Sequence, residues 1–214
     1  MKEHRLRFAF VTCALIALCF LLFRPGKPRY QGRSLDSWVK DFHLVGGEQH
    51  EKAKVAVRHM GTNALPKLIK MLRYEAPAWK VRLQEWNEWI PIIKFRFQAA
   101  SVRHWRAETA LQALGPIAVP TLLDLVKEGK SGGRAWDALF MIGEQGITPL
   151  TGALTNSDPN IRTYAAMALA SLESEGSAAV PALLRKLDDS DYRVREAVTN
   201  ALRSIDPQAH NIPL

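Results

Sequence analysis

The 214-residue chain has very few cysteines, and the only two, Cys13 and Cys19, lie in an apolar run near the N-terminus. The rest of the chain therefore has no thiol for a disulfide bond, a thiolate metal site or a cysteine nucleophile. The six histidines lack the spacing of metal ligands, and no glycine-rich phosphate loop is present. Residues 188–191 resemble the start of a calcium loop but lack its glycine and its final glutamate. The sequence therefore predicts no catalytic residues, no metal and no cofactor.

Excess charge of one sign is also scarce outside two segments. The formal net charge is +8, but residues 1–33 alone contain seven Lys/Arg and one Glu, a net charge of +6. Residues 67–106 contain nine Lys/Arg and three Glu, also +6, so the remainder of the chain after residue 33 is at −4. A nucleic-acid-binding protein usually carries a basic stripe over its body. The distribution therefore disfavours nucleic acid as a partner.

The longest uncharged apolar run lies near the N-terminus. Sixteen residues, 8–23, follow Lys2, Arg5 and Arg7, which is the layout of a secretory signal or a signal anchor. As a helix the run would be about 24 Å long, less than the roughly 30 Å hydrocarbon core of a bilayer. Because no small-x-small cleavage pattern follows, we expect residues 1–24 to be an uncleaved single-pass membrane anchor. A cleaved signal peptide is the alternative.

The orientation of this anchor does not follow from the positive-inside rule, because basic residues flank both of its sides. Short N-terminal anchors usually keep the N-terminus inside, so we expect the body to be exported. Residues 25–33, rich in Pro, Gly and Arg, are interpreted as a juxtamembrane linker. Residues 34–45 are expected to form a helix that begins at Ser34 and covers the open end of the domain that follows, with docking of a partner as the alternative. Its apolar residues fall on one helical face: Leu35, Trp38, Val39 and Phe42.

Four times in the residues that follow, a helical pattern ends in a small turn and restarts at a proline. The turn glycines are Gly61, Gly115, Gly143 and Gly176, and the prolines are Pro66, Pro120, Pro149 and Pro181. Helix pairs at this spacing are typical of stacked repeats, and proline at the start of a helix loses no hydrogen bond. The apolar residues after three of the prolines have identical offsets, which predicts that Leu123 and Leu184 are buried between repeats. We expect the second helices to line a concave face.

Two of the expected first helices start in the same way. Asp158 and Arg162 precede one apolar pattern, and Asp191 and Arg195 precede the next, 33 residues later. The aspartates are expected to cap their helices, and the charged residues are expected to form a ladder between adjacent repeats. We therefore interpret all four residues as structural rather than catalytic.

These turns and helix starts resemble those of the HEAT-repeat family, in particular the short bacterial units grouped with phycobilisome-lyase HEAT-like repeats. The resemblance extends over about residues 50–206, and the segment Tyr30–Trp38 just after the apolar run is similar to that of membrane-anchored HEAT proteins of environmental bacteria. It implies an all-α fold, an armadillo-like α-solenoid of helical-hairpin repeats over residues 46–206, followed by a C-terminal tail, 207–214. The family includes scaffolds, lyases and nucleic-acid enzymes, so the resemblance implies a fold more specifically than a function.

An insertion of about residues 74–104 separates the first two repeats, because Pro66 and Pro120 are 54 residues apart while the later gaps are 29 and 32. Its basic residues and tryptophans suit a partner surface, a membrane interface or nucleic acid. The candidate partner surface consists of Trp79, Lys80, Arg82, Trp86, Trp89, Arg96, Arg103 and Trp105. The alternative, which we favour for the tryptophans, is that they belong to the core or to an elaborated loop.

The sequence favours a binding protein over an enzyme, because stacked repeats offer a long surface and no set of catalytic residues is evident. We expect a membrane-tethered, non-catalytic scaffold that binds an unidentified protein partner and no small-molecule substrate. The alternatives are a HEAT-like-repeat enzyme of the lyase or DNA-glycosylase type, and a lipid- or nucleic-acid-binding module that uses the basic, Trp-rich residues 67–106.

Overall fold

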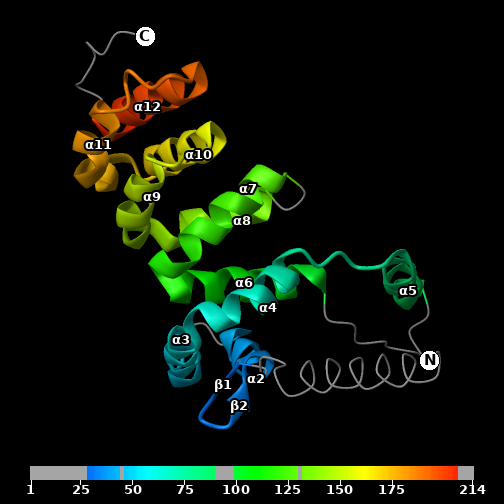
Figure 1. The fold of residues 1–214 in the computed structure, drawn as a ribbon. Helices are drawn as coiled ribbons and strands as arrows, with labels where there is room; N and C mark the ends of the chain where they lie inside the picture. The colour runs from blue at the N-terminus through cyan, green and yellow to red at the C-terminus, as the bar shows by residue number, and fades with distance from the viewer. Residues whose placement is uncertain (1–27, 44–45, 90–98, 130–131, 207–214) are drawn as a thin grey trace, which may run out of the picture.

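The computed structural model describes residues 28–43, 46–89, 99–129 and 132–206, with side chains for all of these except 43 and 84–89. Apart from one short hairpin, this part of the chain is helical (Figure 1). The predicted all-α class is therefore confirmed. The anchor expected at residues 1–24 and the tail expected at 207–214 lie outside the described residues.

The described chain begins with a small hairpin and a short helix. Strand β1 (Arg29–Tyr30) pairs antiparallel with β2 (Arg33–Ser34) around two residues of positive φ, as tight hairpin turns require. This hairpin lies where a linker was expected. Helix α2 (Leu35–Lys40) follows directly, and Ser34 precedes it without a side-chain capping bond. The residues predicted for the inner face are confirmed as buried: Leu35, Trp38, Val39 and Phe42.

After α2, the described chain contains four pairs of helices, each pair joined by a short 3-10 turn. They are α3 (Glu48–Met60) and α4 (Leu65–Leu72), α6 (Ala100–Leu114) and α7 (Val119–Glu128), α8 (Gly132–Ile142) and α9 (Ile147–Ala153), and α10 (Pro159–Ala170) and α11 (Val180–Leu184). Helix α12 (Tyr192–Ile205) follows the last pair. Neighbouring pairs pack on one another: α6 lies against α3, α4 and α8, and α10 lies against α7, α9 and α12. One apolar core therefore runs through all the pairs.

Helix α5 (Ala78–Trp89) comes between the first two pairs in the sequence, and Figure 1 shows it beside the row of paired helices rather than within it. Because α4 ends at Leu72 and α6 begins at Ala100, the inserted residues are about 73–99. The insertion predicted at about 74–104 therefore extends too far at its C-terminal end. The last residues of that predicted range belong to the start of α6.

One continuous helical stretch among the described residues, Ala100–Glu128, is long and apolar enough to cross a membrane by length and composition. It consists of α6, α7 and the turn between them, and 61% of its most apolar window is buried inside the protein. Such burial by other helices is typical of a core segment. This stretch is therefore accounted for by the helical core.

The turns between paired helices begin with a residue of positive φ, a region that favours glycine. Three of these residues are glycines with φ between 53° and 60°: Gly61, Gly115 and Gly143. In the fourth turn the equivalent residue is Glu173, with φ of 49°, and not Gly176 as the sequence suggested. Gly176 lies three residues later, where a Cβ atom would meet Ile205 Cδ1 and Leu169 O at 3.1 Å. Close packing, rather than φ, therefore favours glycine at position 176.

The apolar residues after the prolines follow the predicted pattern except at one position. Two residues after three of the prolines, the leucine is fully buried: Leu68, Leu122 and Leu183. One residue further on, Leu123 is 1% exposed but Leu184 is 48% exposed. The prediction that Leu184 is buried is therefore wrong. Helix α7 has α8, α9 and α10 against it, whereas α11 packs mainly on α12 and on the turn before it, so the described residues leave one side of α11 uncovered.

Candidate functional site

The described members of the predicted partner surface lie on two helices and have different surroundings. On α5, Trp79 is 54% exposed and Arg82 is exposed, while the Lys80 ammonium donates to the Tyr74 hydroxyl over 3.2 Å. On α6, Trp105 is half-buried against the apolar core, as one of the two interpretations of the tryptophans predicts. Three further members lie where the structure describes no side chains: Trp86, Trp89 and Arg96.

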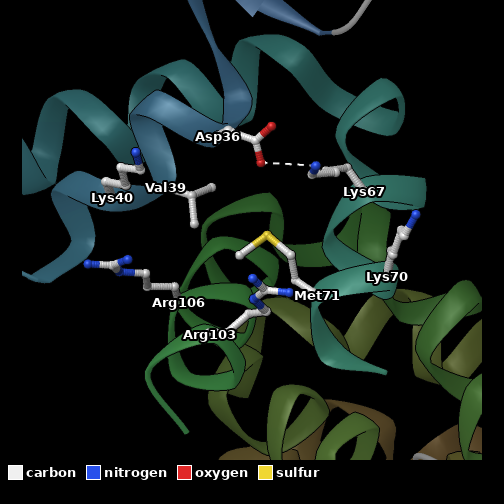
Figure 2. A pocket seen from close by; sticks show the side chains of 8 residues that line it. All are labelled: Asp36, Val39, Lys40, Lys67, Lys70, Met71, Arg103 and Arg106. Carbon is white, nitrogen blue, oxygen red and sulfur yellow. Dashed lines mark ion pairs between the residues drawn. The ribbon is translucent and has the colours of Figure 1, made fainter. Parts of the chain in front are cut away.

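A basic pocket lies where α2, α4 and α6 meet, with a volume of about 330 Å³ (Figure 2). It is lined by Asp36, Val39 and Lys40 of α2, Lys67, Lys70 and Met71 of α4, and Arg103 and Arg106 of α6. Of these residues, Arg103 alone belonged to the predicted surface. The sequence indicates excess positive charge in residues 67–106, but it does not indicate that the two ends of this segment meet at one pocket.

Helical spacing explains why these residues face the same space. Residues three or four apart in sequence lie on one face of a helix. Lys67, Lys70 and Met71 have this spacing on α4, and Arg103 and Arg106 have it on α6. The other faces of both helices are buried in the core, so packing of α4 on α6 turns their basic residues towards α2.

Positive charge dominates the pocket. It contains five cationic side chains and one carboxylate, a net charge of +4. Within the lining, Asp36 Oδ1 pairs with Lys67 Nζ at 3.1 Å (Figure 2). A lining with this excess of positive charge favours an anion in the pocket.

The two arginines are held in different ways. The Arg103 guanidinium lies over the Tyr74 ring, 3.8 Å from its centre, which positions the charge without neutralising it. Arg106 is half-buried, and its buried Nε has no hydrogen-bond partner among the described residues. Burial lowers the pKa of Arg106, and the nearby carboxylate of Asp41 opposes this change. An arginine stays charged at neutral pH, so the pocket keeps a partly buried cation.

Tyr74 also connects the pocket to the insertion. Its carbonyl oxygen lies 2.6 Å from Nε2 of His104, which is buried on α6. His104 is thus a packing residue. The contacts of Tyr74 with α6 and with Lys80 hold the chain that leaves α4 against the start of α6.

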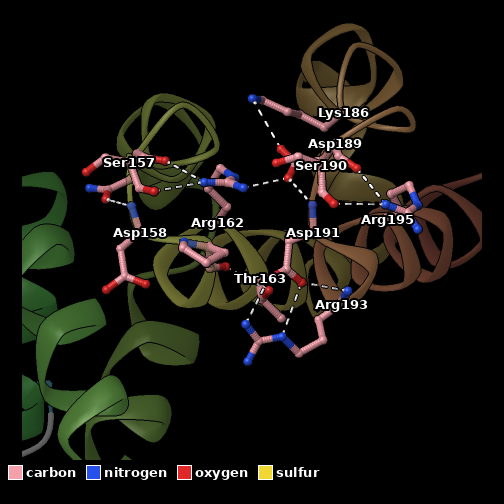
Figure 3. A network of polar contacts seen from close by, with 12 residues as sticks. Ser157, Asp158, Arg162, Thr163, Lys186, Asp189, Ser190, Asp191, Arg193 and Arg195 are labelled. Atoms are coloured by element: carbon pink, nitrogen blue, oxygen red, sulfur yellow. Dashed lines mark hydrogen bonds and ion pairs between the residues drawn. The ribbon is translucent and has the colours of Figure 1, made fainter.

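A polar network joins the C-terminal units (Figure 3). Arg162 Nη1 donates to the carbonyl oxygens of Asn156 and Ser157 over 3.0 and 3.1 Å, and its Nη2 pairs with Asp189 Oδ1 at 2.6 Å. The Arg162 and Asp189 side chains are only 10% and 5% exposed. Burial raises the pKa of Asp189, but hydrogen bonds from Arg162 and from the Asp191 amide outweigh it, so the pKa is lowered.

The predicted helix caps are confirmed. The side chains of Asp158 and Asp191 accept hydrogen bonds from the amides of Asn160 and Arg193, each over 2.9 Å. A ladder of polar pairs links the C-terminal units, but its partners differ from the predicted ones. Lys127–Asp158 joins α7 to the start of α10, and Arg162–Asp189 and Asn160–Arg193 join α10 to the loop before α12 and to α12 itself. Four of these members were not predicted: Lys127, Asn160, Asp189 and Arg193.

Two hollows lie beside α12. One, of about 460 Å³, lies between α10 and α12 and is lined by Thr163, Met167, Ala170, Arg193, Glu196, Ala197 and Asn200. Met167 is 45% exposed in it. The other, of about 580 Å³, lies beside the uncovered side of α11 and includes Leu184, Leu187 and Tyr192. Within the residues that the structure describes, no three His, Cys, Asp or Glu side chains are grouped as a metal site requires.

The comparison with protein families gives a match in the C-terminal part of the chain. Residues 147–211 match the family described as HEAT repeats, and this range includes α9, α10, α11 and α12. It contains the polar network and the hollow between α10 and α12. HEAT repeats are in general protein-interaction scaffolds. The comparison with curated proteins found no match.

Proposed function

We propose that the protein is a membrane-tethered, non-catalytic scaffold, an α-solenoid of HEAT-like repeats that binds a protein partner. The observation that carries the proposal is the hollow of about 460 Å³ between α10 and α12, which we call the groove. It lies within the residues that match HEAT repeats. The packing of helical pairs on one another in chain order supports the solenoid arrangement. A stack of this kind supplies an extended binding surface without a catalytic centre.

The chemistry of the groove suits a partner that inserts an apolar side chain. Its lining contains the apolar residues Met167, Ala170 and Ala197 together with polar residues. Methionine adapts its shape to different apolar groups, and small alanines leave room between two helices. An amphipathic helix bound in a groove of this composition would place its apolar face on Met167.

Membrane tethering is a separate part of the proposal and rests on the apolar residues 8–23. A reporter fused after Leu214 tests it together with export of the body. We expect activity from a reporter that works only outside the cytosol. Activity only from a cytosolic reporter would contradict export and would make nucleic acid a candidate partner again.

The groove is tested by a photo-cross-linking amino acid at position 167 of the full chain in its native membrane. We expect one protein to be captured, and we expect the variant Asn200→Arg to abolish capture, because Asn200 is exposed at the rim and arginine would fill the groove. The control places the same cross-linker at Glu175, which is exposed outside the groove.

Equal capture at positions 167 and 175 would contradict the proposed docking site. Turnover of a substrate by the full chain, abolished by one polar substitution, would contradict the non-catalytic role.

A further inference from the structure

We infer that the basic pocket between α2, α4 and α6 binds a phosphate group, carried either by a small molecule or by a lipid headgroup. This site is distinct from the groove between α10 and α12 and uses different residues. The inference therefore stands or fails independently of the proposed protein partner.

Cations from three helices that are distant in sequence line one space. Lys40 comes from α2, Lys70 from α4 and Arg106 from α6, and Figure 2 shows Lys70 across this space from the other two. Asp36 is the one acidic residue of the lining, and it pairs with Lys67; Asp41, outside the lining, pairs with Arg33. A concave site whose lining has an excess of positive charge concentrates anions.

The pocket arginines differ from Arg162, the arginine that is buried among the described residues. Arg162 uses its Nη groups on two carbonyls and on the Asp189 carboxylate. In the pocket, Arg103 lies on the Tyr74 ring, and no ion pair involving Arg103 or Arg106 is found among the described residues. The Nε atoms of Arg106 and Arg162 both lack a partner among the described residues, so the contrast lies in the Nη groups. The hydrogen-bonding capacity of these guanidinium groups is thus available to a ligand.

The donor geometry and the volume of the pocket indicate which kind of anion it suits. Two arginines at positions i and i+3 of one helix present planar donors that match the oxygens of a phosphate, and the lysines add point charges. A volume of about 330 Å³ is small for a peptide but sufficient for a phosphate ester or a headgroup. A lipid source is included because residues 8–23 precede α2 by a short segment.

The test uses the full chain in micelles of an uncharged detergent at constant ionic strength. One arm measures binding of inorganic phosphate by calorimetry. The second arm measures binding of short-chain phosphatidic acid, with short-chain phosphatidylcholine as the neutral reference. Binding in both arms indicates that the phosphate group alone is sufficient, and binding only of phosphatidic acid indicates a lipid headgroup.

Two variants connect binding to the pocket. Arg106→Gln and the double variant K40Q/K70Q are each expected to weaken phosphate-group binding by at least about tenfold, because each removes charged hydrogen bonds. Lys40 and Lys70 are exposed, so the double variant keeps the test valid if Arg106→Gln does not fold. The matched control K52Q/R185Q removes two exposed cations outside the pocket and is expected to change affinity by less than about twofold.

Three results would overturn the inference. The first is absence of binding to both inorganic phosphate and phosphatidic acid. The second is unchanged affinity in the pocket variants that fold. The third is an equal loss of affinity in K52Q/R185Q, which would mean that binding depends on net charge alone.

Discussion

The two ends of the molecule use their basic residues differently. In the C-terminal units, Arg162 and Arg195 are bound to loop carbonyls, and Arg162 also pairs with a buried carboxylate. At the N-terminal end, Arg103 and Arg106 face a pocket whose one carboxylate pairs with Lys67. The first arrangement holds neighbouring units together, and the second leaves positive charge for a ligand.

This difference is invisible in composition, because both ends contain arginine on helices. What distinguishes them is the supply of acceptors. The loops before α10 and α12 place carbonyls and Asp189 around their arginines, whereas α2 contributes a single acidic residue to the pocket. A basic residue is structural where the fold surrounds it with acceptors, and is free for function where the fold does not.

The largest expected effect concerns the buried pair of the C-terminal network. Arg162→Ala is expected to lower the free energy of unfolding by about 3–5 kcal/mol, because the buried Asp189 loses its 2.6 Å partner and keeps only the longer 3.5 Å pair with Lys186. Arg195→Ala is the matched control: it loses bonds to two loop carbonyls but is exposed, so we expect less than about 1.5 kcal/mol. Urea unfolding measures both, and equal effects would remove the distinction between a buried and an exposed arginine.

The next comparison is between the interior and the end of the stack. Leu123→Ala is expected to cost about 2–5 kcal/mol because the side chain is 1% exposed among α7 and its neighbours. Leu184→Ala, at the same offset from its proline, is expected to cost less than about 1 kcal/mol because 48% of the residue is exposed. Thermal unfolding of both variants measures the difference. A large loss at Leu184 would show that the full chain covers this side of α11.

Two substitutions in the turns are expected to have smaller effects on stability, opposite in sign to each other. Gly115→Ala should destabilise the protein by about 1–3 kcal/mol, because φ is +60°, a conformation strained for alanine, whereas the exposed Gln145 side chain near the new Cβ can move away. Glu173→Gly should stabilise it by about 1 kcal/mol, because glutamate occupies the positive φ there. Melting temperatures test both changes, and a destabilised Glu173→Gly would contradict the equivalence of these turns.

The smallest effect is the pH dependence of the α12 cap. The hydrogen bond from Arg193 lowers the pKa of Asp191 to about 2 from 3.8. Because the folded-state pKa is the lower one, this stabilisation is present above pH 3.8 and is lost as the pH falls towards 2. Asp191→Asn can still cap the helix but does not titrate there. Wild type should therefore lose more stability than the variant between about pH 5 and about pH 2, and parallel melting curves would exclude the effect.

Much of the fold could be predicted from local patterns. The turn positions depend on glycine and proline, and the caps depend on Asp158 and Asp191, each of which acts within a few residues. The exposure of Leu184 could not be predicted, because it depends on which helices pack beside α11. Three additional residues in the fourth turn likewise separated Glu173 from the apparent repeat glycine, Gly176.

The candidate site was predictable only in part. The sequence indicates excess positive charge in residues 67–106, but this count includes residues of α5 that lie apart from the pocket. The pocket unites Lys40, Lys70 and Arg106, and no short-range pattern joins these positions. Only the packing of α2 and α4 on α6 brings them together.

The most direct test of the account measures both binding sites in the same two variants of the full chain. K40Q/K70Q should weaken phosphate-group binding by at least about tenfold and leave capture of the protein partner at position 167 unchanged. Asn200→Arg should abolish that capture and leave phosphate-group affinity within about twofold of wild type. If either variant impaired both activities equally, the separation between a ligand-binding N-terminal end and a partner-binding C-terminal end would be contradicted.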